Sequence, residues 1–328
     1  MYHVGADTTG NEMYHVGVDI GGTNIKAGLV DSGYKLFGNI SCETALPRSA
    51  ESVCDDVVKL VNEIVEKAGI TLTQIKDIGI GCPGTINPEA GMVEYANNLG
   101  WYKFPIQKYI SDKFGAAFPI RIANDADAAA VGEFFAGSAK GAKSTVVITL
   151  GTGLGSGAII NGKLVTGHYN GGGEIGHMVI EYNGKPCTCG RKGCFETYAS
   201  ATGLINLTKE EMDNSPESLM WQLAGSLDKV DGRTAFDAKR KNDAAASRVV
   251  ESYVNYLACG ITNVVNIYQP EIISIGGGVC NEGDNILLPL REIIRSYAYG
   301  SPTPNTEIRI CTLGNDAGMI GAALLGEI

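Results

Sequence analysis

The stretch VGVDIGGTNIKAGLV, residues 16–30, decides the fold. Val16 to Ile20 is apolar enough for a short strand, Gly21-Gly22-Thr23-Asn24 makes a tight turn, and Ile25 to Val30 runs back as a second strand. This pattern predicts a β-hairpin with a glycine-rich tip. Dinucleotide-binding folds and P-loop folds need a glycine-rich loop that opens a helix, so the stretch excludes both.

The same device recurs in the middle of the chain. Thr145 to Leu150, the tip GTGLG at residues 151–155, and Ser156 to Ile160 predict a second hairpin, and two hairpins of one design predict two similar lobes. Apolar periodicity predicts helices over residues 49–68, 124–135, 244–268, 284–296 and 317–325, and strands over 78–82, 120–123, 272–275 and 307–311. Strand pairs followed by alternating helices and strands indicate an α/β protein of two lobes.

Composition limits the classes of partner. The 328 residues are 44% hydrophobic and carry a formal net charge of −10, which repels nucleic acid and anionic lipid. No stretch approaches the ~20 apolar residues that a membrane span needs, and the first dozen residues lack the pattern of a secretion signal. We therefore expect a soluble, cytoplasmic protein that binds neither nucleic acid nor membrane. Residues 1–12 are interpreted as a duplicated or artificial leader, because MYHVG at 1–5 recurs at 13–17.

Three of the nine cysteines crowd together. Cys187, Cys189 and Cys194 follow His177, and three thiolates with one imidazole match a closed tetrahedral zinc site. The alternative is three buried thiols beside an unrelated histidine. The short spacing with intervening glycines favours the metal, because it lets the backbone fold around one ion. Four protein ligands leave no position for an activated water, so the predicted role is structural.

The two glycine-rich tips suit phosphate oxygens, because their backbone N–H groups point outward without bulky side chains in the way. Asp19 directly precedes the first tip and could hold Mg²⁺ through water. Either hairpin alone is explained as an ordinary turn. Two copies together with Asp19 favour a nucleotide.

Polar residues beside the predicted strands form a second group of candidates. Asn124 and Asp125 follow an apolar strand and open a helix, at the carboxyl edge where α/β sheets bind ligands. An N-cap with acidic residues near the helix dipole is the alternative reading, and Asp127 competes for that role. Glu174 and His177 would share one face if residues 174–178 are helical. Glu196 follows Cys194 closely, so the same metal would fix its position.

Taken together, these motifs resemble the ROK family of sugar kinases and repressors, within the sugar kinase, chaperone and actin-like ATPase superfamily. The resemblance covers residues 14–328. It is carried by DIGGTN at 19–24, Asn124-Asp125 with Ala128 to Ala130 and Gly132-Glu133, GTGLG at 151–155, GEIGH at 173–177, and CTCG at 187–190 through Cys194-Phe195-Glu196.

The resemblance implies two lobes of ribonuclease H-like (actin-like ATPase) topology with a cleft between them. Residues 13–122 with 314–328 would form the N-terminal lobe, and 123–313 the C-terminal lobe with a zinc-binding segment at 177–194. It implies an ATP-dependent hexose kinase with ATP, Mg²⁺ and structural Zn²⁺ as cofactors. It also implies a homo-oligomer, a dimer or a tetramer.

The resemblance also implies roles for single residues. Asp125 would accept the proton of the attacking sugar hydroxyl. The hexose would be held by Gly84, Asn97, Asn124, Asp125, Glu174, His177 and Glu196. ATP and its magnesium would be held by Asp19, Gly22, Thr23, Asn24, Lys26, Gly151, Thr152, Gly153, Gly276, Gly277 and Gly278. His177 would serve zinc with one ring nitrogen and the sugar with the other.

Glucose is the favoured substrate, phosphorylated on its 6-hydroxyl. Family members that act on N-acetylmannosamine can carry Arg after the glycine of the Pro83-Gly84 loop, where this chain has Thr85, and Asn97 resembles the glucokinase members. N-acetylmannosamine, N-acetylglucosamine and fructose remain alternatives. A non-catalytic, sugar-responsive regulatory protein is the alternative of a different class, and the presence of Asp125 favours an enzyme over it.

Overall fold

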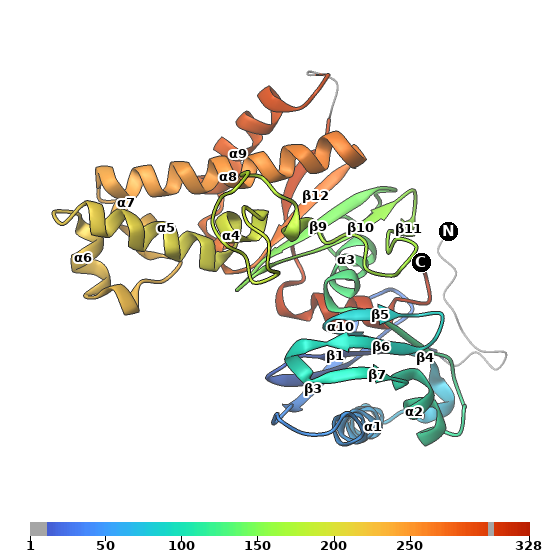
Figure 1. Cartoon of the computed structure of the whole chain (residues 1–328). Helices are drawn as coiled ribbons and strands as arrows, with labels where there is room; N and C mark the ends of the chain where they lie inside the picture. Colours follow the sequence, from blue (N-terminus) through green and yellow to red (C-terminus); the bar gives the residue numbers. More distant parts are fainter. Residues whose placement is uncertain (1–11, 301–304) are drawn as a thin grey trace. The chain divides into compact units, whose positions relative to one another are not determined.

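The computed structural model describes residues 12–300 and 305–328, and its first sheet contains the hairpin predicted from residues 16–30 (Figure 1). The strand order is β3-β2-β1-β4-β8. The first three strands form an antiparallel meander, and β4 and β8 run parallel to β1. The strands are β1 (Tyr14–Ile20), β2 (Asn24–Val30), β3 (Leu36–Glu43), β4 (Ile75–Cys82) and β8 (Ile120–Asn124).

The second sheet repeats this arrangement. Its order is β11-β10-β9-β12-β13, so in each sheet the five strands, counted along the chain, are arranged 3-2-1-4-5. The predicted pair of similar hairpins and the predicted α/β fold class are confirmed. The strands are β9 (Thr145–Leu150), β10 (Leu154–Ile160), β11 (Lys163–Leu164), β12 (Ile272–Gly276) and β13 (Glu307–Ile310). A third, antiparallel sheet of β5 (Thr85–Asn87), β6 (Met92–Ala96) and β7 (Trp101–Phe104) was not predicted.

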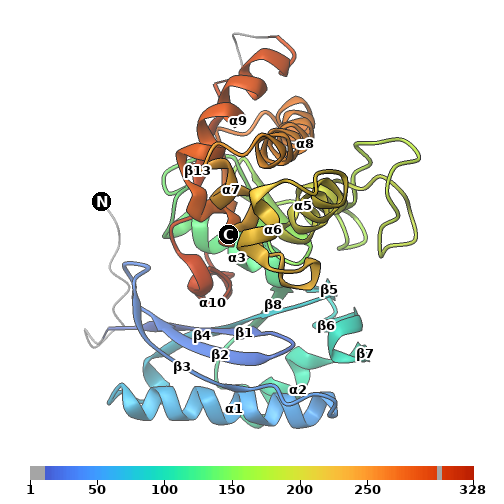
Figure 2. The same cartoon turned by 90° about the vertical axis from the view of Figure 1, so that its left-hand side faces the viewer.

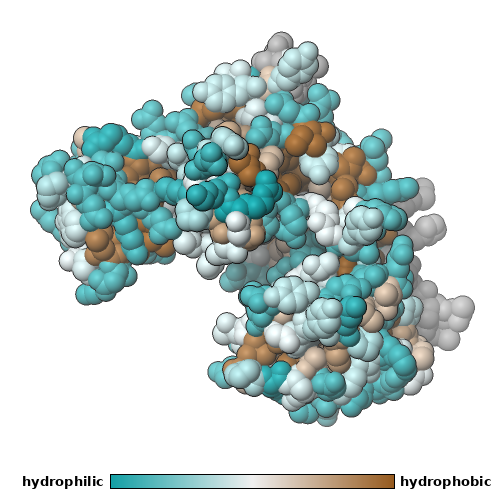
Figure 3. Space-filling model, viewed as in Figure 1, coloured by the Kyte–Doolittle hydropathy of each residue, from teal (hydrophilic) through white to brown (hydrophobic). Residues whose placement is uncertain are grey.

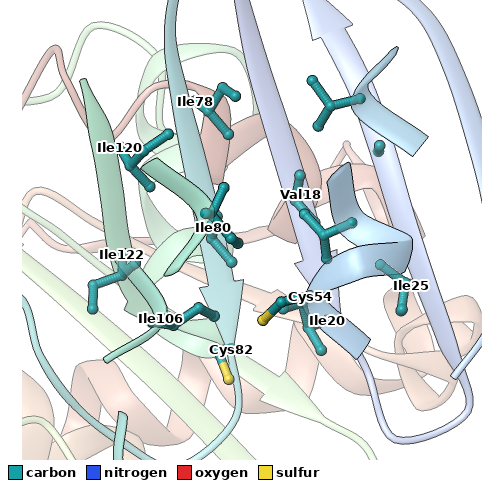
Figure 4. Close-up of a cluster of buried hydrophobic side chains, with 14 of the residues drawn as sticks. Val18, Ile20, Ile25, Cys54, Ile78, Ile80, Cys82, Ile106, Ile120 and Ile122 are labelled. Atoms are coloured by element: carbon teal, nitrogen blue, oxygen red, sulfur yellow. The ribbon is translucent and has the colours of Figure 1, made fainter. Parts of the chain in front are cut away.

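Helix α1 (Ala50–Lys67) lies along one face of the first sheet (Figure 2). Its N-cap Ser49 accepts a hydrogen bond from Ser52 N, and Gly69 after its end has a φ of 68°. Isoleucine and valine side chains of the strands pack into a buried cluster that also contains Cys82 of β4 and Cys54 of α1 (Figure 4). Burial of each fully buried isoleucine or valine side chain stabilises the fold by about 1.5–3 kcal/mol. Helix α2 (Ile106–Lys113) packs against α1 and β8.

Helix α10 (Ala317–Ala323) packs against β1, β4 and α3 (Asp125–Phe135). Its small residues let it approach the sheet backbone very closely. A Cβ at Gly17 would lie 1.9 Å from Met319 O, and one at Gly79 would lie 1.7 Å from Ala322 O. Only glycine fits at these two strand positions.

The long helix α8 (Ala244–Tyr268) has the bounds that apolar periodicity predicts. Asp243 caps its start by accepting from Ala246 N, and Gln269 ends it in the left-handed region, one residue before Pro270. Helices α5 (Ala201–Asn214), α7 (Thr234–Lys239) and α9 (Asp284–Tyr297) pack against α8. The remaining short helices are α4 (Phe195–Ala199) and α6 (Leu219–Ala224).

The chain divides into two compact units. The first contains the chain up to Val147, Gly157–Gly173 and Thr312–Ile328, and the second contains Ile148–Ser156 and Glu174–Cys311. This division differs from the lobe boundary predicted at residues 122/123, because α3 packs against α10 and β4 and so joins the first unit.

Two further expectations concern membrane spans and the first twelve residues. The face drawn in Figure 3 is mostly hydrophilic, with scattered hydrophobic patches. Within residues 12–300 and 305–328, no helix is both long and apolar enough to cross a membrane. Apart from Glu12, the leader interpreted at residues 1–12 lies outside the described residues.

Candidate functional site

In the first unit, three parallel strands bring the predicted residues to one edge. The register pairs Asp19 of β1 with Gly81 of β4, and Cys82 of β4 with Asn124 of β8. The carboxyl ends of β1, β4 and β8 therefore lie side by side, and Asp125 opens α3 at this edge. This is the position at which open α/β sheets hold ligands.

Two carboxylates lie at this edge: Asp19, half-buried near the end of β1, and Asp125, exposed at the start of α3. Burial, together with the charge of Asp125, raises the pKa of Asp19 to about 6, and Lys26 opposes this. Desolvation by the surrounding protein also raises the pKa of Asp125, although the N–H of Ala126 donates to its Oδ1 over 2.9 Å. Among the described residues, neither carboxylate has a salt-bridge partner. The pair is suited to a proton acceptor and to a hard divalent cation such as Mg²⁺.

The first glycine-rich tip is held from outside the hairpin by Thr44. Thr44 N donates to Thr23 O over 2.8 Å, and its hydroxyl donates to Gly21 O over 2.6 Å. Gly22, Thr23 and Asn24 are exposed, and a Cβ at Gly22 would meet no protein atom within 4 Å. The tip therefore leaves room for a ligand to approach its backbone. The predicted cofactor residue Lys26 donates to Asn315 O over 3.0 Å.

Gly84, Asn97 and Asn124 are linked by backbone packing and hydrogen bonds. Asn124 Nδ2 donates to Gly84 O over 2.9 Å, while its Oδ1 caps α3 by accepting from Ala126 N over 2.8 Å. Gly84 has a φ of 101°, and a Cβ there would lie 2.1 Å from Tyr95 O. Tyr95 in turn donates its hydroxyl hydrogen to Asn97 Oδ1 over 2.9 Å. The N-cap reading of Asn124 is thus correct, and the same amide also fixes the Gly84 loop.

A cavity of about 300 Å³ in the first unit does not coincide with this edge. Of the predicted site residues it includes Asn124 alone, and Gly84, Asn97 and Asp125 are not part of its wall. The wall is formed by Ile86, Pro88, Arg121, Ile122, Ala123, Asn124, Asp127, Leu164, Thr166, Asn170, Leu325 and Ile328. Among the predicted hexose residues of the first unit, only Asn124 therefore contributes to this wall.

In the second unit, the four predicted metal ligands lie together. The ligand atoms of His177, Cys187, Cys189 and Cys194 are all within 4.8 Å of one another. His177 Nδ1 is 3.7 Å from Cys187 Sγ, and Cys189 Sγ is 3.7 Å from Cys194 Sγ. Zinc–sulfur bonds of about 2.3 Å in a tetrahedron place sulfur atoms roughly 3.8 Å apart, so the group fits zinc.

His177 lies on a 3₁₀ turn, Ile175–His177. The helix considered over residues 174–178 is therefore a single 3₁₀ turn. Glu174 is exposed at the start of this turn. The Nδ1 atom of His177 faces the thiols, which leaves Nε2 for a ligand on the other side of the ring. The predicted double role of the histidine would use this second nitrogen for the sugar.

The second glycine-rich tip lies beside the predicted glycines that follow β12. Gly151 N donates to Gly153 O over 3.0 Å, and Ala201 N donates to Gly151 O over 2.9 Å. Gly277 has a φ of 105°, and a Cβ there would lie 2.1 Å from Leu150 O. The structure thus brings Gly151 and Gly277 together at the end of β9.

Sequence reasoning missed two residues that shape these sites. Thr44 is fully buried and fixes the first tip, and Tyr95 orients Asn97. Neither belongs to a motif: Thr44 reaches the tip from the end of β3, and Tyr95 contacts Asn97 two residues along the chain.

Comparisons with known proteins agree with this geometry. The model of the ROK family matches residues 15–327. A glucokinase of Halalkalibacterium halodurans is 36% identical over 309 residues, covering 93% of this chain and 92% of that one. A ROK family glucokinase from Streptomyces griseus, solved in complex with glucose and AMPPNP, is 32% identical with a TM-score of 0.77, covering 95% and 98%. A ROK hexokinase from Thermus thermophilus is 30% identical with a TM-score of 0.80, covering 95% and 97%.

Proposed function

Because this chain belongs to the ROK family, we propose that it is an ATP-dependent hexose kinase that phosphorylates the 6-hydroxyl of glucose. The observation that carries the proposal is the position of Asp125, which opens α3 at the edge where β1, β4 and β8 end and whose charge acts on Asp19. The relatives named glucokinase support glucose as the hexose.

Asp125 acts as the general base of the reaction. Phosphoryl transfer passes through a loose transition state, so positioning and charge neutralisation matter more than base strength. The carboxylate accepts the proton of the attacking hydroxyl and aligns its oxygen. Since desolvation by the surrounding protein raises the pKa of Asp125 above its ordinary value, the base is ionised over a narrower pH range than an unperturbed aspartate, and turnover declines as the pH falls through that pKa.

The glycine-rich tips hold the triphosphate through backbone N–H groups. Gly22 and Thr23 serve in the first unit, and Gly151 to Gly153 in the second, with Gly276 to Gly278 toward the adenosine. Asp19 holds magnesium, which neutralises phosphate charge when bound. The sugar hydroxyls are held by Gly84, Asn97, Asn124, Glu174, His177 and Glu196. Zinc bound by His177 and the three cysteines would have a structural role. It would hold the sugar-binding residues of the second unit in place and would take no part in the reaction.

One assay tests both which sugar is the substrate and whether the protein is an enzyme or a non-catalytic regulator. ADP release is measured with MgATP against glucose, mannose, fructose, N-acetylglucosamine and N-acetylmannosamine. Glucose should give the highest kcat/KM. Robust turnover of an N-acetyl sugar with little turnover of glucose would move the proposal to that sugar. Sugar binding without ADP release from any member of the panel would favour the non-catalytic regulator instead.

A further inference from the structure

Thr44 uses its hydroxyl, its N–H and its carbonyl in contacts around the first glycine-rich tip. The residue follows β3 and is fully buried. Its hydroxyl donates to Gly21 O over 2.6 Å, and its N–H donates to Thr23 O over 2.8 Å. Its carbonyl oxygen accepts from Arg48 NH1 over 3.4 Å, and the same NH1 pairs with Asp56 of α1 over 2.6 Å. Thr44 is thereby held between the tip and α1.

The hydroxyl contact fixes the direction of one N–H group at the tip. The carbonyl of Gly21 and the N–H of Gly22 belong to the same trans peptide, so they point in opposite directions. Because Gly21 O faces the Thr44 hydroxyl, Gly22 N–H points away from Thr44. Among the described residues, neither Gly22 N–H nor Thr23 N–H has a hydrogen-bond acceptor, and both residues are exposed. The tip therefore presents donors that suit an anionic group.

A peptide between two glycines needs an external contact to keep its direction. Glycine adopts positive and negative φ with similar ease, so the Gly21–Gly22 peptide could turn over and present its carbonyl instead. An outward carbonyl would repel phosphate oxygens. The second tip has a contact of the same kind, since Gly151 O accepts from Ala201 N over 2.9 Å. In the first unit the donor is a side chain, which can be replaced.

We infer that Thr44 is a positioning residue for the nucleotide, whose hydroxyl holds the Gly21–Gly22 peptide so that Gly22 N–H faces a phosphate group. The inference rests on the proposed phosphate role of Gly22 and Thr23. The hydroxyl hydrogen of Thr44 is bound to Gly21 O, so Thr44 acts through the peptide. Without the hydroxyl, a triphosphate must order the tip as it binds, and its affinity falls.

Replacement of the hydroxyl by a methyl group tests the inference. Binding of AMPPNP with magnesium, in the absence of sugar, and binding of glucose alone are measured by calorimetry on the full chain. In Thr44→Val we expect AMPPNP to bind about three- to tenfold more weakly, the effect of one buried hydrogen bond, with unchanged glucose affinity. In the ADP-release assay, KM for MgATP should rise while KM for glucose stays at the wild-type value.

Two further variants separate the hydroxyl from packing. Thr44→Ser keeps the hydroxyl and should bind AMPPNP as the wild type does. Thr208→Val in α5 is the matched control, because Thr208 is also fully buried and its hydroxyl donates to Leu204 O over 2.8 Å. It loses a hydrogen bond of the same kind outside the tip, so its affinity for both ligands should equal that of the wild type.

Equal AMPPNP affinity in the wild type and in folded Thr44→Val overturns the inference. An equal loss in Thr208→Val, or a loss in Thr44→Ser as large as in Thr44→Val, overturns it as well. If valine at position 44 prevents folding, Thr44→Cys decides, because a thiol is a weaker donor than a hydroxyl. AMPPNP must then bind more weakly in Thr44→Cys, and wild-type affinity there overturns the inference. Failure of the wild type to bind AMPPNP overturns the proposed function itself, and the role of Thr44 with it.

Discussion

Replacing Asp19 by Asn should stabilise the protein at neutral pH while removing the proposed magnesium ligand. Burial, followed by the charge of Asp125, raises the pKa of Asp19 from 3.8 to about 6. The fold therefore disfavours the ionised carboxylate. The neutral amide of Asn has nearly the same shape and carries no charge to bury.

The magnitude follows from the pKa shift. A shift from 3.8 to about 6, at about 1.4 kcal/mol for each pKa unit, corresponds to about 3 kcal/mol. Because the folded pKa is raised, this contribution to stability is fully present below the unfolded pKa near 4 and is lost as the pH rises through 6. Asn does not titrate. The variant should exceed the wild type by about 3 kcal/mol at pH 7 and by close to zero at pH 4.

Urea unfolding at a series of pH values between 4 and 7, in buffer without magnesium, measures both free energies of unfolding. Asp213→Asn, at an exposed position on α5, is the matched control and should follow the wild type at every pH. A variant at position 19 that is less stable than the wild type at pH 7, or an advantage that grows toward acid, would refute the reasoning.

Four other expectations are measurable. Asp125→Asn should lower kcat by several orders of magnitude while glucose still binds in calorimetry; a rate near the wild type would remove the general base. Metal analysis should find about one zinc per chain, and Cys189→Ser should lose it; full occupancy in that variant would contradict the ligand set. Glu133→Gln should cost about 2–3 kcal/mol in urea unfolding, because Glu133 Oε2 accepts from Ser138 N and Oε1 from Leu313 N, so an amide NH₂ must face a donor. Gly79→Ala should cost about 3 kcal/mol, since its Cβ would lie 1.7 Å from Ala322 O; wild-type stability would mean that α10 can move away.

The predictions that succeeded from sequence alone rest on local signals. The two glycine-rich hairpins and the bounds of α8 follow from turn residues and apolar periodicity within a short window. The sheet of β5, β6 and β7 lacks such a signal, because its strands are three to five residues long and are defined by pairing with each other. The placement of α3 in the first unit depends on α10, nearly two hundred residues later in the chain.

The candidate site divides in the same way. Motif residues such as Asp125 and His177 are recognisable because their chemistry and spacing are unusual. Tyr95 has no distinguishing signal in the sequence, and the β5–β6 pairing is what places its backbone against Gly84. Gly277 is explained by a carbonyl contact with Leu150, which no local pattern contains.

The two units hold their site residues by different forces, and this difference has a consequence for metal removal. In the first unit, strand register and backbone hydrogen bonds fix Asp19, Gly84 and Asn124 without any metal. In the second unit, the side chains of His177 and the three cysteines form a group that fits zinc, and thiols and an imidazole attract each other only weakly without an ion. Loss of zinc should therefore leave the first-unit residues in place while His177, proposed to hold sugar, loses its fixed position. Of the two proposed sets, only the second-unit set would depend on a metal for its geometry.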